Sequence, residues 1–165
     1  MIAAIVAVAI LFVLLPILGN IGGQGGVTAA KDAISNSLSN VSSGGTITSQ
    51  AFSLQKGNAL TSKNFSDKGF DQHSILFAED PSIVPSVFEI ETDDDFSSFK
   101  YTGSVTFQTQ AYVICEITGT SLQGTLDRLD LGVDADPESL CGTEGSEGEY
   151  AYQPCCLVVL QRAKK

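Results

Sequence analysis

The sequence has few basic residues, a single histidine and no tryptophan. Among its 165 residues, 9 are Lys or Arg and 19 are Asp or Glu, which gives a net charge of −10 at pH 7. A protein of this charge repels the phosphate backbone of nucleic acids, so we expect no nucleic-acid partner. The absence of Trp argues against a cleft in which sugar rings stack on indole.

The scarcity of histidine argues against catalysis. His73 is the only histidine, so any Ser–His–Asp or Cys–His arrangement would have to use it. The chain contains no G-x-S-x-G motif, and catalytic zinc usually takes several histidines. We therefore expect no enzyme, no cofactor and a structural role for His73. A secreted hydrolase that uses His73 is the catalytic alternative.

Charge is missing altogether from the beginning of the chain. The segment Met1–Leu18, which we call the apolar segment, contains no charged residue, and the first charge is Lys31. An uninterrupted run of about 18 apolar residues is a membrane-span candidate, and as a helix it rises roughly 27 Å. Apolar side chains cover every side of such a helix, which predicts burial all round, in lipid or in other protein.

Three interpretations of the apolar segment compete. A secretory signal peptide needs a positively charged region before the apolar run, and no Lys or Arg precedes it here. A signal anchor is oriented by flanking Lys and Arg, which are likewise missing on the N-terminal side. A processed stem, from which a basic leader was removed directly before the run, accounts for the missing cations, and we favour it.

The apolar segment resembles the N-terminus of mature type IV pilins, and the archaeal members of that family more than the bacterial ones. The bacterial signature begins with Phe and has Glu at its fifth position, where this chain has Met1 and Ile5. Archaeal pilins commonly lack this glutamate. The resemblance extends by pattern from Met1 to about Ser42 and beyond that only by general layout.

The resemblance implies a structural subunit of a cell-surface filament, used for adhesion. The apolar segment would lie in the membrane before assembly, and the assembly machinery would then move it into a bundle of identical segments. The protein would thus be its own main partner, in a homopolymer outside the cell. The residues expected to form the filament core are Ile2, Ile5, Val6, Val8, Ile10, Leu11, Phe12, Leu14, Leu15, Ile17 and Leu18. The alternative is a monomeric, signal-anchored β domain that binds a ligand or partner.

A second helical segment is expected after a glycine-rich break at Gly19–Gly26. Apolar residues then recur at spacings of three and four from Val27 to Val41, which predicts an amphipathic helix with one buried stripe. Thr28 is a candidate N-cap, and Gly44 and Gly45 are expected to end the helix. We assign residues 1–45 to a hydrophobic helical stem.

Residues 46–165 are predicted to form a β-rich head domain. The apolar pattern changes there to a period of two, which is typical of half-buried antiparallel strands. The whole chain is therefore expected to be α+β, with a long hydrophobic helix followed by an antiparallel β-sandwich-like head. The expected strands are Thr46–Gln55, His73–Ala78, Val84–Thr92, Phe99–Val105, Thr106–Thr118, Leu122–Leu131 and Tyr150–Arg162.

The four cysteines of the chain predict two disulfides. They are Cys115, Cys141, Cys155 and Cys156, and an even number in an exported chain is typical of disulfide bonding. Three pairings are possible. Cys155 and Cys156 point to opposite faces of a strand and should therefore bond different partners. A zinc site is the alternative, but the spacings match no pair of C-x-x-C knuckles.

Two further patterns indicate surface features. Acidic residues cluster at Glu89–Asp95 and between Asp127 and Glu138. We interpret both clusters as solvated loops, because neither matches the calcium-binding loop motif. The candidate calcium ligands, should one bind, are Asp130, Asp134 and Asp136. The sequons at Asn40 and Asn64 are candidate N-glycosylation sites of an exported protein.

Overall fold

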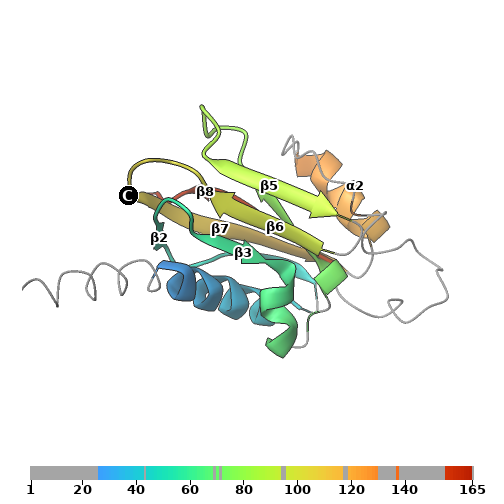
Figure 1. The fold of residues 1–165 in the computed structure, drawn as a ribbon. Helices are drawn as coiled ribbons and strands as arrows, with labels where there is room; N and C mark the ends of the chain where they lie inside the picture. The colour runs from blue at the N-terminus through green and yellow to red at the C-terminus, as the bar shows by residue number, and fades with distance from the viewer. Residues whose placement is uncertain are drawn as a thin grey trace, which may run out of the picture.

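The chain forms an α+β fold in which a helix is followed by two β-sheets and a second helix (Figure 1). The computed structural model describes residues 26–42, 44–68, 70, 72–93, 96–116, 119–129, 137 and 155–164. The apolar segment Met1–Leu18 lies outside these ranges. Within them, no helix is both long enough and apolar enough to cross a bilayer.

The described elements are short apart from two helices and two long strands. The first helix covers residues 26–41. The strands are β1 (Gly45–Thr48), β2 (Phe52–Leu54), β3 (Ala59–Thr61), β4 (Ile75–Glu79), β5 (Phe88–Asp93), β6 (Phe96–Tyr101), β7 (Phe107–Glu116) and β8 (Cys155–Arg162). The remaining elements are the 3-10 helices η1 (Ser62–Lys68) and η2 (Gln72–Ser74) and the helix α2 (Gly119–Leu129).

The larger sheet is mixed, which corrects the expectation of purely antiparallel strands. Its order is β1-β7-β8-β4, with β2 also paired to β7, and the smaller sheet has the order β3-β6-β5. Strands β4 and β8 run parallel, with Ile75 opposite Cys156. A period of two identifies a strand and its faces, but it is the same for both pairing directions. The sequence pattern therefore carried no signal for this parallel pair.

Strand β8 is central and buried on both faces, as its apolar sequence CCLVVLQ predicts. It lies between β7 and β4. Its residues alternate between two apolar cores: Cys156, Val158 and Leu160 face one, and Cys155, Leu157 and Val159 face the other. The first helix and the smaller sheet contribute to the first core, and α2 covers the second. The larger sheet is therefore a middle layer.

The first helix belongs to the head's main core. Its predicted stripe is confirmed, since Ala30, Ile34, Leu38 and Val41 are buried there. Thr28 lies inside the helix, which already includes residue 26, so its assignment as N-cap is wrong. The rest of the expected glycine-rich break lies outside the described residues.

The prediction of a strand at Leu122–Leu131 is wrong, because this region forms α2. Leu122 and Leu126 are four residues apart and both are buried against the second face of the larger sheet. A spacing of four places two side chains on one side of a helix, whereas neighbouring residues of a strand alternate between faces. The helical period was thus present in the sequence, and the surrounding strands led us to the wrong element.

Two smaller differences concern the ends of strands. The expected strand Thr46–Gln55 is two strands, β1 and β2, interrupted around Ser49. Ser49 is buried, and its hydroxyl accepts a hydrogen bond from the backbone N–H of Ala111 at 2.8 Å, in place of a regular ladder. The three-residue strand β3 lies in a stretch that we expected to be a loop. Residues 150–154 of the last expected strand lie outside the described residues.

Glycine at position 26 is required by close packing of the first helix on the head. A Cβ at Gly26 would lie 2.8 Å from Oδ1 of Asn58 and 2.9 Å from the backbone oxygen of Ser53. We expect Gly26→Ala to lower the free energy of unfolding by about 1–3 kcal/mol, because it overpacks this contact. Urea denaturation of the full chain in detergent, followed by circular dichroism, measures the change.

The matched control is Gly124→Ala in α2, where nothing lies within 4 Å of the added Cβ. It should raise the stability by about 0.5–1 kcal/mol, since alanine favours helix over glycine. Equal effects of the two substitutions would contradict the close approach at Gly26.

Candidate functional site

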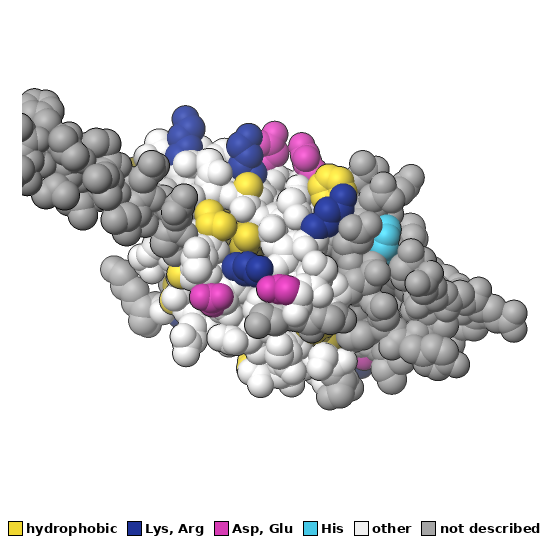
Figure 2. Space-filling model, turned by 60° about the horizontal axis from the view of Figure 1, so that its bottom comes forward, with side chains coloured by type: hydrophobic (Ala, Val, Ile, Leu, Met, Phe, Trp, Pro, Cys, Tyr) yellow, Lys and Arg dark blue, Asp and Glu magenta, His cyan; other side chains and the backbone are white. Residues whose placement is uncertain are grey.

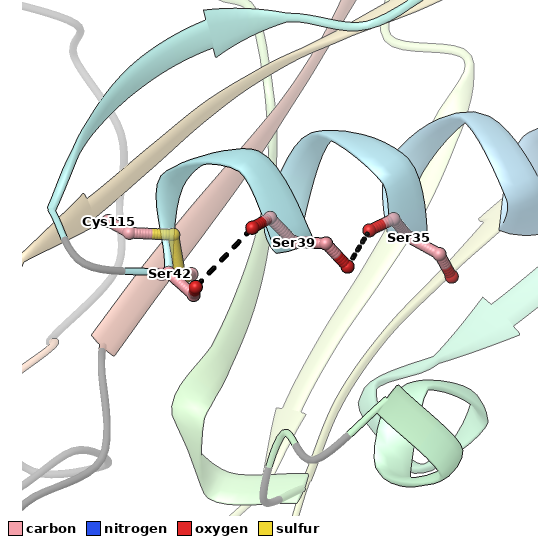
Figure 3. Close-up of a disulfide and its surroundings, with 5 residues drawn as sticks. Ser35, Ser39, Ser42 and Cys115 are labelled. Atoms are coloured by element: carbon pink, nitrogen blue, oxygen red, sulfur yellow. Dashed lines mark hydrogen bonds between the residues drawn. A yellow bond between two sulfur atoms is a disulfide. The ribbon is translucent and has the colours of Figure 1, made fainter.

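A disulfide joins the two longest strands at the end of the sheet near the C-terminus of the first helix (Figure 3). Cys115 of β7 lies directly opposite Cys156 of β8, and their sulfur atoms are 2.04 Å apart. Both face the first core, which also contains Val41. Cys155 is disulfide-bonded as well and faces the second core. The expectation that the adjacent cysteines point to opposite faces is confirmed.

None of the described cysteines is a free thiol, which rules out a zinc site built from their thiolates. The sequence left three pairings open, and the strand register selects Cys115–Cys156, because it places the two residues side by side. Cys141 lies outside the described residues.

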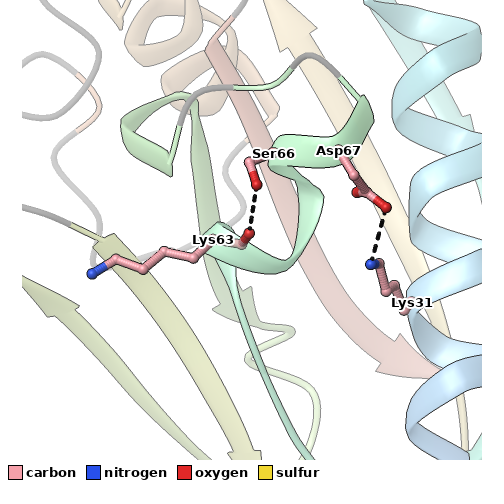
Figure 4. A network of polar contacts seen from close by, with 4 residues as sticks. All are labelled: Lys31, Lys63, Ser66 and Asp67. Carbon is pink, nitrogen blue, oxygen red and sulfur yellow. Dashed lines mark hydrogen bonds and ion pairs between the residues drawn. The ribbon is translucent and has the colours of Figure 1, made fainter.

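Serine side chains of the first helix form hydrogen bonds within the helix, and one ion pair joins it to a neighbouring element. Figure 3 shows Ser39 donating from its hydroxyl to the carbonyl of Ser35, at 2.9 Å. In Figure 4, Lys31 of this helix meets Asp67 of η1, with Nζ and Oδ2 3.3 Å apart. Both side chains are partly exposed, so the pair contributes little to stability. The buried stripe, rather than this ion pair, holds the helix in place.

The expected polar sites do not converge on one place. His73 lies in η2, immediately before β4, and no group of three or more potential metal ligands occurs among the described residues. On β5, Glu89 pairs with Lys100 at 3.1 Å. The candidate calcium ligands Asp130, Asp134 and Asp136 lie outside the described residues.

The two sequon asparagines are exposed and lie on different elements. Asn40 is near the end of the first helix, and Asn64 is in η1. Oδ1 of Asn64 accepts a hydrogen bond from the backbone N–H of Thr61 at 2.7 Å. Both positions are accessible at the surface of the head, and their modification stays a prediction.

A hollow lies on the head where β7 begins and β8 ends. It has a volume of about 490 Å³ and is lined by residues that include Ala51, Val105, Phe107, Gln108, Arg162 and Lys164. The Arg162 guanidinium lies over the Phe107 ring, with Cζ 5.3 Å from the ring centroid. A lining that combines an aromatic ring with two cations suits an apolar group that carries a negative charge. No sequence motif marked this hollow, because its residues come from three separate segments.

The face of the head in Figure 2 has a different character. Lys and Arg side chains lie close to Asp and Glu side chains there, and hydrophobic side chains are scattered. Such a mixed surface is typical of a solvated face. The hollow near Phe107 is therefore a better candidate for binding than this face.

The chain matches no protein-family model, no curated protein and no solved structure.

The Cys115–Cys156 disulfide should contribute strongly to the stability of the head. It closes a loop with a sequence separation of 41, and its removal in Cys115→Ala/Cys156→Ala should cost about 2–5 kcal/mol. Urea denaturation of the full chain measures this loss. The pairing itself is checked by mass spectrometry of non-reduced peptides, where a peptide joining Cys156 to any cysteine other than Cys115 would refute it.

Proposed function

We propose that this protein is the structural subunit of an extracellular filament similar to archaeal type IV pili. It acts by assembly rather than by catalysis. The apolar segment Met1–Leu18 is its polymerisation element, in the membrane before assembly and in a bundle of identical segments afterwards. Transfer of each large apolar side chain to water costs roughly 1.5–3 kcal/mol, which makes a return to solvent prohibitive. The acidic heads would cover the bundle and act in surface adhesion.

The observation that carries the proposal is the way in which the apolar segment is joined to the head. The helix over residues 26–41, which follows it, is part of the head's main core through Ala30, Ile34 and Leu38. A force applied to the apolar segment would therefore be transmitted through residues 19–25 to the core itself. A filament subunit needs such a mechanical connection, since every load between heads passes through the bundle.

Two further features support a filament subunit. The disulfide Cys115–Cys156 is typical of exported proteins. The two sheets also meet through side chains: the rings of Phe77 on β4 and Phe99 on β6 are 5.1 Å apart. This contact supports a sandwich-like head. We propose that the apolar segment is the long hydrophobic helix of the filament core, joined to the first helix through the glycine-rich residues 19–25.

A monomeric domain anchored by the same segment is the second candidate. The hollow over Phe107 favours it, because an anchored domain would act by binding a ligand. The two candidates differ in their physical state. Head-to-tail contacts that do not close on themselves produce an open helical polymer, whereas an anchored domain stays monomeric in detergent.

Electron microscopy of material sheared from the cell surface, combined with intact-mass analysis, tests the proposal. We expect thin helical filaments built from a chain that begins at Met1. Leu11→Lys should abolish them, because a charge at the centre of an apolar helix costs about 2.5–3.5 kcal/mol. Leu11→Ile is the control and should assemble normally. A wild-type chain that is well expressed and found only as a detergent-dependent monomer would refute the filament.

A further inference from the structure

The end of the head that contains Gly26 has a distinctive surface. Gly26, the first described residue, packs closely on Ser53 and Asn58, and Ser53 belongs to β2, which pairs with the beginning of β7. The start of the first helix, the C-terminal residues and Phe107 therefore lie at one end of the molecule (Figure 1). Since residue 25 is bonded to residue 26, the chain enters the described part of the head at this end.

Two large hydrophobic side chains are strongly exposed at this end. Val84 and Val105 are 84% and 71% exposed, and they are the only large hydrophobic residues so exposed among those described. Their loops are held in place: the backbone N–H of Thr102 donates to the Val87 carbonyl at 2.8 Å, and the Tyr101 hydroxyl donates to the Val105 carbonyl at 2.6 Å. Val105 lines the hollow over Phe107. Val84 lies in the loop after β4, which begins beside the end of β8, where the backbone N–H of Asp80 donates to the Leu160 carbonyl at 2.9 Å.

The same end carries cations in a protein of net charge −10. Arg162 and Lys164 are exposed, and neither forms an ion pair with another described residue. The nearby acidic residues turn toward their own loop, where Glu79 accepts hydrogen bonds from Ser86 and Val87 and Asp80 accepts one from Ser82. We call Val84, Val105, Phe107, Arg162 and Lys164 the docking end.

We propose that the docking end rests on an anionic membrane surface before assembly, with a lipid phosphate between Arg162 and Lys164. Val105 and the Phe107 hollow would meet the upper part of the lipid chains, where aromatic and basic residues are favoured. This inference rests on the proposed function only in placing the apolar segment in a bilayer. A head joined to that segment through residues 19–25 must lie close to the headgroups.

Two partners could cover the docking end: a membrane, or the apolar segment of a second copy of the chain. Charge complementarity favours the membrane. That segment contains no anion between Met1 and Leu18, so it would leave both cations unpaired in a dry interface, which is costly. Lipid phosphates provide the missing partners. A cation close to an anionic membrane increases binding by about fivefold, so the pair should increase it by roughly 25-fold if the two effects add.

The absence of tryptophan allows a direct test. We would introduce a single Trp by Val105→Trp and reconstitute the full chain in vesicles with brominated lipid chains, which quench indole on contact. Phosphatidylglycerol vesicles should quench this Trp strongly and phosphatidylcholine vesicles weakly. The matched control is Thr46→Trp, at the opposite end of β7, where Thr46 is exposed and paired with Ile114; it should be quenched in neither. Val84→Trp is a second probe of the docking end.

Charge reversal tests the cations separately. Adding Arg162→Glu/Lys164→Glu to Val105→Trp should abolish the difference between the two lipids, while circular dichroism shows that the head stays folded. Equal, weak quenching at positions 105 and 46 would overturn the proposal. The proposal would also be overturned if the Trp at position 105 were shielded from solvent in lipid-free filaments but not quenched in vesicles. A second copy of the chain would then be the partner of the docking end. If the Trp at position 105 is quenched in phosphatidylglycerol vesicles but the chain forms no filaments, membrane docking is supported and only the filament proposal is contradicted.

Discussion

The pairing of β7 with β8 is the contact on which the rest of the head depends. The two strands align over eight residue pairs, from Thr109 opposite Arg162 to Glu116 opposite Cys155. Because β8 is apolar on both faces, this pairing creates two surfaces that must be covered. The first helix and the smaller sheet cover one, and α2 covers the other. The disulfide Cys115–Cys156 then joins the same two strands covalently.

The layered arrangement has a consequence for how the apolar segment is held. The first helix contributes Ile34 and Leu38 to the same core as Val113 and Val158 of the central strands. The element that follows the apolar segment is therefore covered by the head and cannot swing freely without unfolding it. A filament requires this kind of attachment, and a ligand-binding domain on a flexible tether does not.

The docking end differs chemically from the face seen in Figure 2, although the chain as a whole has a net charge of −10. The docking end combines exposed Val84 and Val105 with two cations, whereas mixed charges cover the face seen in Figure 2. An uneven surface of this kind can hold a head in one orientation on a membrane of opposite charge. Orientation before assembly would present each subunit to a growing filament in the same way.

The sequence by itself determined the elements whose pattern is local. Side-chain directions repeat every 3.6 residues in a helix and every two residues in a strand. These periods predict the buried stripe of the first helix, the central position of β8 and the opposite directions of Cys155 and Cys156. Tertiary structure decided what depends on partners far along the chain. The parallel pairing of β4 with β8, the choice of Cys156 as partner of Cys115 and the hollow over Phe107 all join segments that no local pattern connects. The helix α2 lies between these cases, because Leu122 and Leu126 show the helical spacing, but only the uncovered face of the larger sheet gives that spacing a place to pack.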